Sequence, residues 1–279
     1  MTQVSVVIPN YNGAKLLSKN LPKVIKACPH SEIIVVDDTS TDDSVKLLKT
    51  QFPQVVTIIN KKNQRFGESC NIGVRQARGE IVILLNSDVV PSENFLKPLI
   101  THFKDPKVFS VGCKEIEEIN GQKVFSGRTI AEFKRGLWVH WKPTDQESQE
   151  TFWTFGGSMA IDRQKFLDLG GFDKLFYPAY WEDFDLCLRA KEKGYKTIFE
   201  KEAIVYHNHE TTNKIVFGLR AIEKMSMRNQ ILLVFKHARG VKLFQHIIWL
   251  PYHLVFTNFK TKGLFGSAYL QAIQRYCSL

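Results

Sequence analysis

Residues 81–88 read IVILLNSD, in which five apolar residues lead directly into a polar turn that ends at Asp88. The earlier stretch 33–38, IIVVDD, has the same form and ends in Asp37 and Asp38. Continuous apolar runs of this length are typical of parallel strands that are covered on both faces. Where strands and helices alternate, the ends of such strands face one ligand crevice. Acids gathered there indicate a cationic or metal-bridged ligand rather than a packing role.

The first 113 residues repeat one pattern, in which an apolar run is followed by a turn and a segment with helical spacing. Strands are expected at 4–8, 33–36, 55–59 and 81–85, and helices at 15–26, 41–50 and 67–77. This alternation predicts an α/β fold with a doubly wound, mostly parallel sheet and helices on both faces.

Beyond residue 108 the pattern changes. The dipeptide Asn120-Gly121 predicts a hairpin over 111–125, and the polar residues 126–150 are expected to form a mobile loop over the crevice. The remaining core elements are a strand with Gly156-Gly157, helices from 162 and over 182–193, and extended segments at 195–199 and 203–206.

Composition restricts the class of protein. The chain has 279 residues, of which 44% are hydrophobic, enough for a sizeable core. Its five cysteines show no CxxC spacing, so we expect reduced and mostly buried thiols rather than disulfides or a zinc site. The start, MTQVSVVIPNYNG, lacks the features of a signal peptide, and we expect a cytoplasmic protein.

Positive charge is concentrated near the C-terminus. The formal net charge is +10, and after Glu210 there are ten Lys and Arg residues against the single acid Glu223, so that segment carries 10 − 1 = +9. Such asymmetry is typical of a surface that meets anionic phosphate, on nucleic acid or on lipid.

The same segment contains an apolar stripe at helical spacing, interrupted by Pro251. The stripe consists of Phe244, Ile247, Ile248, Tyr252, Val255, Phe256 and Phe259. The uncharged stretch 243–259 has 17 residues, too few to span a hydrocarbon core of ~30 Å. An interfacial helix on an anionic membrane fits better. The alternative is that the stripe packs on the domain as ordinary core.

Each acidic cluster allows a functional and a structural interpretation. Asp37 and Asp38 could accept hydrogen bonds from a nucleobase or a ribose hydroxyl, or Asp38, Ser40 or Asp42 could cap the next helix. The triplet Asn86-Ser87-Asp88 offers oxygen ligands to a divalent cation, although a turn after a strand also favours these residue types.

The third cluster, WEDFD at 181–185, opens a predicted helix. Glu182 and Asp183 could there stabilise the helix dipole, or a carboxylate could remove a proton from an attacking hydroxyl. Asp185 and Arg189 are spaced to form an ion pair.

A histidine pair follows the last extended segment, in YHNHE at 206–210. A neutral imidazole there could complete the metal shell begun by Asp88. The spacing does not separate His207 from His209, and either could be structural. The chain has no G-x-G-x-x-G, phosphate-loop or G-x-S-x-G motif.

Taken in order, these segments resemble glycosyltransferase family 2, of GT-A fold, and within it the bacterial rhamnosyltransferase-like members. The resemblance covers residues 3–210 and is carried by VVIPNYNG, VVDD, NQRFGESCNIGVRQARGE, ILLNSD, FGGSMAI, LGGFD, WEDFDLCLR and VYH. It implies a metal-dependent, inverting transfer of a sugar from a nucleotide diphosphate to an acceptor hydroxyl.

The resemblance also assigns residues. It places Pro9, Tyr11, Asn12, Asp37 and Asp38 at the nucleoside, Arg65, Phe66, Gly67 and Asn71 beside the donor, and Gly156, Gly157, Trp181 and Glu182 at the substrates. Asp183 matches the general base, Asp88 the metal-binding acid and His207 an additional metal ligand. Asn86 stands where the family has the first acid of its aspartate-any-aspartate motif, which leaves the choice between Mg²⁺ and Mn²⁺ open.

We therefore expect a glycosyltransferase domain at 1–210 and a basic helical extension at 211–279. The expected donor is dTDP-rhamnose or a UDP-sugar, and the acceptor a glycan or lipid-linked sugar at the inner face of the cell membrane. Two other classes share some features. A sugar-nucleotide nucleotidyltransferase would show a glycine-rich, basic loop after the first strand, where this chain has PNYNG. A nucleic-acid-binding protein would use the basic tail and leave Asp88 and Asp183 unexplained.

Overall fold

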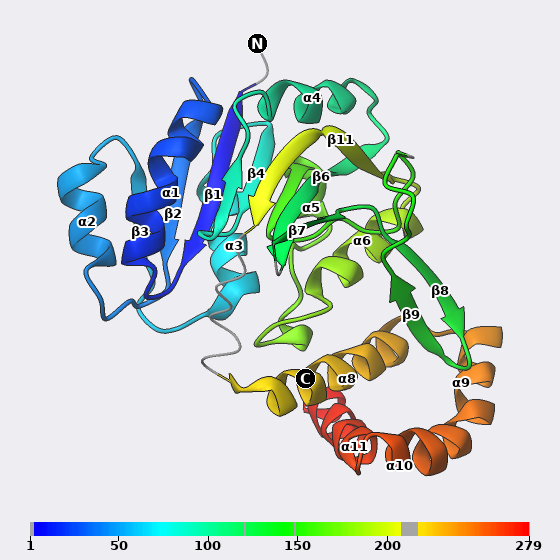
Figure 1. Cartoon of the computed structure of the whole chain (residues 1–279). Coiled ribbons are helices and arrows are strands. Elements are labelled where there is room, and N and C mark those ends of the chain that lie inside the picture. Colours follow the sequence, from blue (N-terminus) through cyan, green and yellow to red (C-terminus); the bar gives the residue numbers. More distant parts are fainter. Residues whose placement is uncertain (1–2, 120, 148, 208–216, 279) are drawn as a thin grey trace.

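The computed structural model describes residues 3–119, 121–147, 149–207 and 217–278. Within these residues a mixed sheet of nine strands forms the centre of the molecule (Figure 1). Its strands are β1 (Val4–Asn10), β2 (Glu32–Asp37), β3 (Val56–Ile59), β4 (Ile81–Leu85), β5 (Val89–Pro91), β6 (Val108–Ile119), β7 (Gln122–Ser126), β10 (Ser158–Asp162) and β11 (Lys196–His207). They follow the order β3-β2-β1-β4-β10-β6-β11-β5, with β7 paired to β6.

Helices cover both faces of this sheet. They are α1 (Ala14–Ala27), α2 (Ser44–Gln51), α3 (Arg65–Gln76), α4 (Leu96–Thr101), the short η1 (His102–Lys104), α5 (Arg163–Asp168), η2 (Lys174–Phe176) and α6 (Glu182–Glu192). Successive residues of β1 point into opposite cores, so that Val7 packs with α3 and Val6 with α1. Because both faces are buried, the strands are continuously apolar. The predicted doubly wound α/β fold is confirmed.

Strand pairing sets the position of the polar ends. β1 pairs in parallel with both β2 and β4, which aligns Asn10 with Asp37 at one edge of the sheet. β10 then runs antiparallel between β4 and β6, with Ser158 opposite Leu85. The turn before β10 consequently meets the turn after β4, where the Asn86 amide donates to the Gly157 carbonyl oxygen at 2.9 Å.

The segment 126–150 differs from the sequence prediction. It was expected to be a loop, but it contains a second sheet of two antiparallel strands, β8 (Ile130–Lys134) and β9 (Leu137–Trp141). The connecting residues Arg135 and Gly136 both have positive φ, at 51° and 75°, as a two-residue hairpin turn requires. Leu137 and Trp138 are buried. The prediction failed because Arg rarely adopts this conformation, and the dipeptide carried no turn signal.

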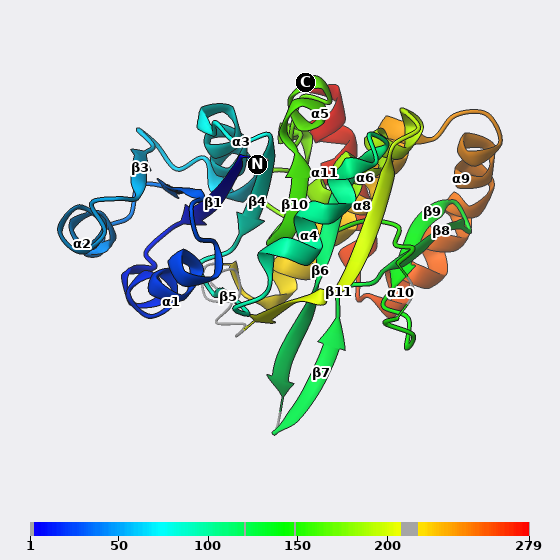
Figure 2. The same cartoon turned by 90° about the horizontal axis from the view of Figure 1, so that it is seen from above.

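The C-terminal extension is helical, as predicted. It consists of α8 (Leu219–His237), α9 (Val241–Tyr252), the π-helical η3 (His253–Thr257), α10 (Asn258–Lys260) and α11 (Leu264–Cys277). Figures 1 and 2 show α8 and α11 side by side against the main domain, while α9 and α10 form an outer arc beyond β8 and β9. The predicted domain boundary at 210/211 lies outside the described residues.

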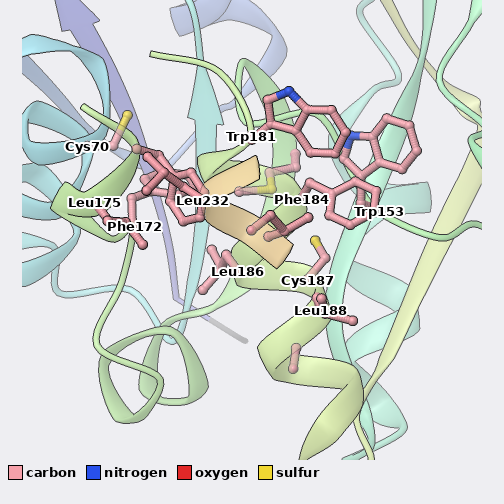
Figure 3. Close-up of a cluster of buried hydrophobic side chains, with 14 of the residues drawn as sticks. Cys70, Trp153, Phe172, Leu175, Trp181, Phe184, Leu186, Cys187, Leu188 and Leu232 are labelled. Atoms are coloured by element: carbon pink, nitrogen blue, oxygen red, sulfur yellow. The ribbon is translucent and has the colours of Figure 1, made fainter. Parts of the chain in front are cut away.

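Helix α8 belongs to the main hydrophobic core. Its residues 231–234 are fully buried, and Figure 3 shows Leu232 beside Phe184 and Leu186 of α6 in one apolar cluster. Four of the five cysteines are buried, as predicted.

Across the described ranges, every helix is too short or too polar to traverse a lipid bilayer.

Candidate active site

A cavity of about 540 Å³ lies at the carboxyl ends of the central strands. Its lining includes twelve of the residues singled out from the sequence. These are Pro9, Tyr11, Asp38, Arg65, Phe66, Asn86, Asp88, Gly156, Gly157, Glu182, Asp183 and His207. The structure thus brings the two distant acids, Asp88 and Asp183, to one cavity.

The wall near β2 is built around Asp38, which is 4% exposed. Its carboxylate accepts hydrogen bonds from the amides of Gln64 (2.6 Å) and Arg65 (2.8 Å) and from Asn60 Nδ2 (2.8 Å). Asp38 therefore organises the entrance to α3, where Arg65 has a positive φ of 62°. At the start of α2, Asp42 accepts the Ser44 amide at 3.0 Å, whereas the N-cap residue Asp43 makes no side-chain cap hydrogen bond.

Five of the predicted substrate residues do not line the cavity. Asp37 is fully buried and accepts hydrogen bonds from Asn10 Nδ2 and the Ser40 amide, both at 2.9 Å. Asn12 Oδ1 accepts the Thr41 amide at 2.7 Å and so joins two loops of the wall. These contacts make Asp37 and Asn12 supports of the cavity in this structure.

The other three lie behind the cavity wall. Asn71 bridges α3 to the main chain of Phe172 through bonds of 2.8 and 2.9 Å. Gly67 packs against the side chain of the same Phe172, where an added Cβ would approach to 3.3 Å. Trp181 is buried and donates its indole N–H to Ser226 Oγ at 3.1 Å.

The acidic end of the cavity joins β4, β5 and β11. Antiparallel pairing of β11 with β5 places His207 opposite Val89, and His207 Nε2 lies 3.4 Å from Asp88 Oδ1. Its Nδ1 lies 3.7 Å from a carboxylate oxygen of Glu115 on β6. Burial lowers the pKa of His207, but Asp88 and Glu115 outweigh it and raise this pKa to about 9. The second candidate, His209, lies outside the described residues.

These groups fit a divalent cation that is shared with a ligand. In the part of the chain that the structure describes, no cluster of three or more His, Cys, Asp or Glu side chains could hold a metal alone. One carboxylate from Asp88 and one imidazole from His207 would leave several positions for phosphate oxygens and water, which is how Mg²⁺ and Mn²⁺ sites at phosphates are built. Asn86 lines the same cavity, and its side chain packs on Gly157, where an added Cβ would meet Nδ2 at 2.5 Å.

The cavity is also lined by Asp183, in the first turn of α6. The two residues before the helix, Tyr180 and Trp181, both have positive φ, at 76° and 73°, and this turn aims the helix start at the cavity. The Asp183 carboxylate accepts the amides of Phe184 (2.8 Å) and Gly156 (3.2 Å). Burial raises the pKa of Asp183, so its carboxylate holds a proton more readily than an ordinary aspartate.

Glu182 lies beside this acid and is 9% exposed. Burial, together with the nearby charge of Asp183, raises the pKa of Glu182 to about 8. Its Oε2 has no hydrogen-bond partner among the described residues. Two neighbouring carboxyl groups whose pKa values are both raised are an arrangement suited to proton transfer.

Sequence reasoning missed several groups around the cavity. Glu115 is 4% exposed, accepts the Ser158 hydroxyl at 2.6 Å and lies behind His207. Lys142, from the segment expected to be a loop, also lines the cavity. Neither residue stands in a motif, and only the pairing of β6 with β10 and β11 brings Glu115 to the site.

The extension contributes to the cavity as well. Phe217, Leu219 and Ile222 line it beside Tyr180. Further along α8, the fully buried Asn229 has its Nδ2 within 2.8–2.9 Å of the carbonyl oxygens of Phe176, Ala179 and Tyr180. The loop that precedes Asp183 is therefore held in place by α8, which lies outside residues 3–210, the part of the chain that resembles the family.

A doubly wound sheet with these acids at its strand ends is the architecture of the GT-A fold. The profile of glycosyl transferase family 2 matches residues 5–170, and the chain belongs to this family. The resemblance to this family that the sequence showed is confirmed.

Similar proteins carry related names. A pre-mycofactocin glycosyltransferase of Mycobacterium tuberculosis is 26% identical over 213 residues, covering 75% of this chain and 43% of the relative. The O-antigen chain rhamnosyltransferase RfbN of Salmonella typhimurium is 22% identical, covering 77% of this chain and 69% of the relative. The chain thus spans less than half the length of the mycobacterial protein.

Two solved structures share the fold. GalNAc-T7 in complex with UDP, GalNAc and Mn²⁺ superposes with a TM-score of 0.68 at 20% identity, covering 84% of this chain and 48% of that one. Truncated TarS of S. aureus in complex with UDP-GlcNAc gives a TM-score of 0.63 at 18% identity, covering 98% and 81%.

Proposed function

We propose that this glycosyltransferase moves a sugar, with inversion and with the help of a divalent metal, from a nucleotide diphosphate to an acceptor hydroxyl. The acceptor would be a glycan or a lipid-linked sugar in the synthesis of cell-surface polysaccharide or glycolipid. The observation that carries this proposal is the common cavity of Asp88, His207 and Asp183. In the proposed reaction Asp88 and His207 would face the phosphates and Asp183 the acceptor hydroxyl, which are the two functions that a single in-line displacement requires.

Asp183 and the pair Asp88 and His207 have different roles in this reaction. Asp183 takes the proton of the acceptor hydroxyl as that oxygen attacks the anomeric carbon. Asp88 and His207 would hold the metal, which when bound supplies a Lewis acid for the departing diphosphate. Arg65, whose buried Nε has no hydrogen-bond partner among the described residues, would donate to the donor nucleotide or its phosphates. A direct displacement by the hydroxyl needs no covalent enzyme intermediate.

The donor is proposed to be dTDP-rhamnose or a UDP-sugar. The printed names of the similar proteins support a nucleotide-sugar donor, because one is a rhamnosyltransferase and others bind UDP or UDP-GlcNAc. The Mn²⁺ in one of these complexes supports a divalent metal.

Asp88→Asn is expected to abolish metal-dependent donor binding. In the wild type, UDP or dTDP at about 100 times its Kd should stabilise the fold by ~2.7 kcal/mol and raise Tm by about 5 °C only when Mn²⁺ is present. Differential scanning fluorimetry with UDP, dTDP and GDP, each with and without Mn²⁺, measures this shift. Asp168→Asn, at an exposed acid on α5, is the matched control and should behave like the wild type. Equal shifts with and without Mn²⁺ in the wild type would contradict the metal requirement.

We also propose that the enzyme lies peripherally on the inner face of the membrane, through the arc of α9, η3 and α10. Nine large apolar side chains of this arc are exposed. They are Val241, Leu243, Phe244, Ile247, Ile248, Leu254, Val255, Phe256 and Phe259. Six of the seven residues of the predicted stripe are among them, and Phe259 is 86% exposed. A contiguous face of this kind favours contact with a partner over ordinary core packing.

The charge around this apolar arc favours an anionic bilayer as the partner. Lys242, Lys260 and Lys262 lie within or next to the arc, and no acid occurs between residues 224 and 279. Apolar side chains flanked by cations bind to the boundary of headgroups and acyl chains in membranes that contain anionic lipids.

Replacing Phe244, Ile248 and Phe259 together with serine is expected to reduce vesicle binding more than tenfold. Each exposed ring or aliphatic chain that enters the acyl region contributes on the order of 1.5–3 kcal/mol when fully buried. Co-sedimentation with vesicles of 70% phosphatidylcholine and 30% phosphatidylglycerol measures the effect. Phe125→Ser, at an exposed ring on β7, is the control. Unchanged vesicle binding by the triple variant would refute the proposal. It would also be refuted if the wild type did not bind vesicles and instead formed a dimer that the triple variant does not form.

A further inference from the structure

A second depression, of about 590 Å³, lies between the starts of α8 and α11. We call it the cationic hollow. Its charged lining residues are Arg220, Lys224 and Lys262, with the hydroxyl-bearing Ser267 beside them. Phe217, Leu219 and Leu264 supply apolar walls, and none of the described Asp and Glu residues is part of the lining. Three positive charges therefore surround one concave surface that has an apolar side.

Among the described residues, no ion pair neutralises these charges. Elsewhere in the extension basic side chains form ion pairs, as Lys236 does with Asp173 at 2.6 Å. Within the described ranges neither Arg220, Lys224 nor Lys262 lies within 4 Å of a carboxylate. Like charges gathered without a counter-charge attract an anion, and Arg and Lys are the side chains that best hold phosphate.

The side chains, rather than the start of the helix, would hold such an anion. The first amides of α11 already have partners, because Phe265 N donates to Thr261 Oγ1 at 3.1 Å and Gly266 N donates to Asn258 Oδ1 at 2.8 Å.

The cationic hollow adjoins the acceptor side of the active-site cavity. Phe217 and Leu219 line both. The same helix fixes the acceptor-side wall, since Ser226 accepts the indole N–H of Trp181 and Asn229 holds the loop before it. The apolar arc proposed to meet the membrane belongs to the same extension (Figure 2). A ligand whose anionic group occupies the hollow could therefore extend toward Asp183 at one end and toward lipid at the other.

We propose that the cationic hollow binds the phosphate or diphosphate that joins the acceptor sugar to a lipid. This inference rests on the proposed function and narrows its acceptor to a lipid-linked phosphate rather than a free glycan. Arg220, Lys224 and Lys262 hold the anionic group, the apolar wall of Leu219 and Leu264 meets the first carbons of the lipid, and the acceptor sugar projects into the neighbouring cavity.

The test uses binding in the absence of donor and metal. Isothermal titration calorimetry of the full chain is carried out with farnesyl diphosphate, with farnesol and with inorganic pyrophosphate. We expect farnesyl diphosphate to bind at least tenfold more tightly than either of the other two probes. Arg220→Glu combined with Lys262→Glu is expected to weaken its binding at least tenfold. Lys46→Glu combined with Lys49→Glu, two exposed lysines on α2, is the charge-matched control and should bind like the wild type.

Three results would overturn the inference. The first is unchanged binding by the Arg220/Lys262 variant, and the second is equal affinity for pyrophosphate and farnesyl diphosphate. The third is displacement of farnesyl diphosphate by UDP with Mn²⁺, which would place the probe in the donor site. Failure of the proposed function would give a different result. If no nucleotide raised the Tm of the wild-type protein, the transfer reaction would be contradicted, whether or not the cationic hollow binds farnesyl diphosphate.

Discussion

Asp183→Asn is expected to reduce kcat by roughly 10²–10⁴-fold, the range that a positioned general base contributes. The substitution removes the proton acceptor but keeps the shape of the side chain. The single amide oxygen of asparagine can still accept the Phe184 amide, which bonds Oδ1 at 2.8 Å, while the longer bond from Gly156 to Oδ2 at 3.2 Å is lost. The rate of nucleotide diphosphate release in the presence of acceptor measures the effect. The thermal shift with UDP and Mn²⁺ should remain that of the wild type. A folded Asp183→Asn enzyme with near wild-type turnover would remove Asp183 from the mechanism.

The pH profile gives a second readout of the same base. Burial raises the pKa of Asp183, and burial with the charge of Asp183 raises that of Glu182 to about 8. A base must be deprotonated to act, so log kcat should rise with pH through the apparent pKa values of this pair and then level off. Glu182→Gln is expected to remove the upper step and leave a single titration. The rising limb should be absent from the residual activity of Asp183→Asn.

Much of the fold follows from local signals in the sequence. The runs at 33–36 and 81–85 are continuously apolar because each strand is buried on both faces, and this property predicts a covered sheet before any pairing is known. The polar residues that end these runs mark one edge of the sheet, because parallel strands share their direction. The common location of Asp38 and Asp88 was predictable for the same reason.

Contacts between distant segments were not predictable in this way. Asp37 and Asp38 are adjacent and chemically alike, yet alternation along β2 turns Asp37 into the wall and Asp38 toward the cavity. Glu115 reaches His207 only through the pairing of β6 with β11. The acceptor-side loop is held by Asn229, which lies 49 residues from Tyr180. No spacing rule connects such pairs, because they depend on the packing of whole elements.

The apolar stripe shows which structural properties the periodicity of a sequence can predict. Spacing of three and four residues correctly predicted one helical face, although Pro251 lies within α9 and the chain continues beyond it as the π-helical η3. Periodicity alone does not reveal whether a face is covered. The exposure of Phe244, Ile248 and Phe259 does, and this exposure supports the proposed membrane contact.

Asp185→Ala is expected to lower the free energy of unfolding by roughly 3–5 kcal/mol, the usual cost of removing one partner from a buried ion network. Asp185 is fully buried in α6. Its carboxylate lies 2.8 Å from Arg189 Nη2, from Lys236 Nζ and from His237 Nε2, and the last two belong to α8. Removing it leaves Arg189 without a carboxylate partner among the described residues, and it leaves Lys236 with Asp173 alone and His237 with Glu192 alone, at the contact between α6 and the extension. Urea unfolding followed by tryptophan fluorescence measures the loss.

The pH dependence of stability identifies this network. Burial raises the pKa of Asp185, but the hydrogen bond from His237 and the charges of Arg189 and Lys236 outweigh it, so this pKa lies below its ordinary value of 3.8. A folded-state pKa below the unfolded one stabilises the protein above pH 3.8, and that stabilisation is lost as the pH falls through the folded value. Asp185→Ala should lack this acid-dependent loss. Asp173→Ala removes a more exposed partner of Lys236 and the cap of η2 at the Leu175 amide, and is expected to cost about 1 kcal/mol. If Asp185→Ala and Asp173→Ala both lowered the free energy of unfolding only slightly, the apolar contacts alone would hold the extension on the main domain. A large loss for Asp185→Ala would mean that this ion network, in addition to the apolar contacts, stabilises the packing of the extension on α6.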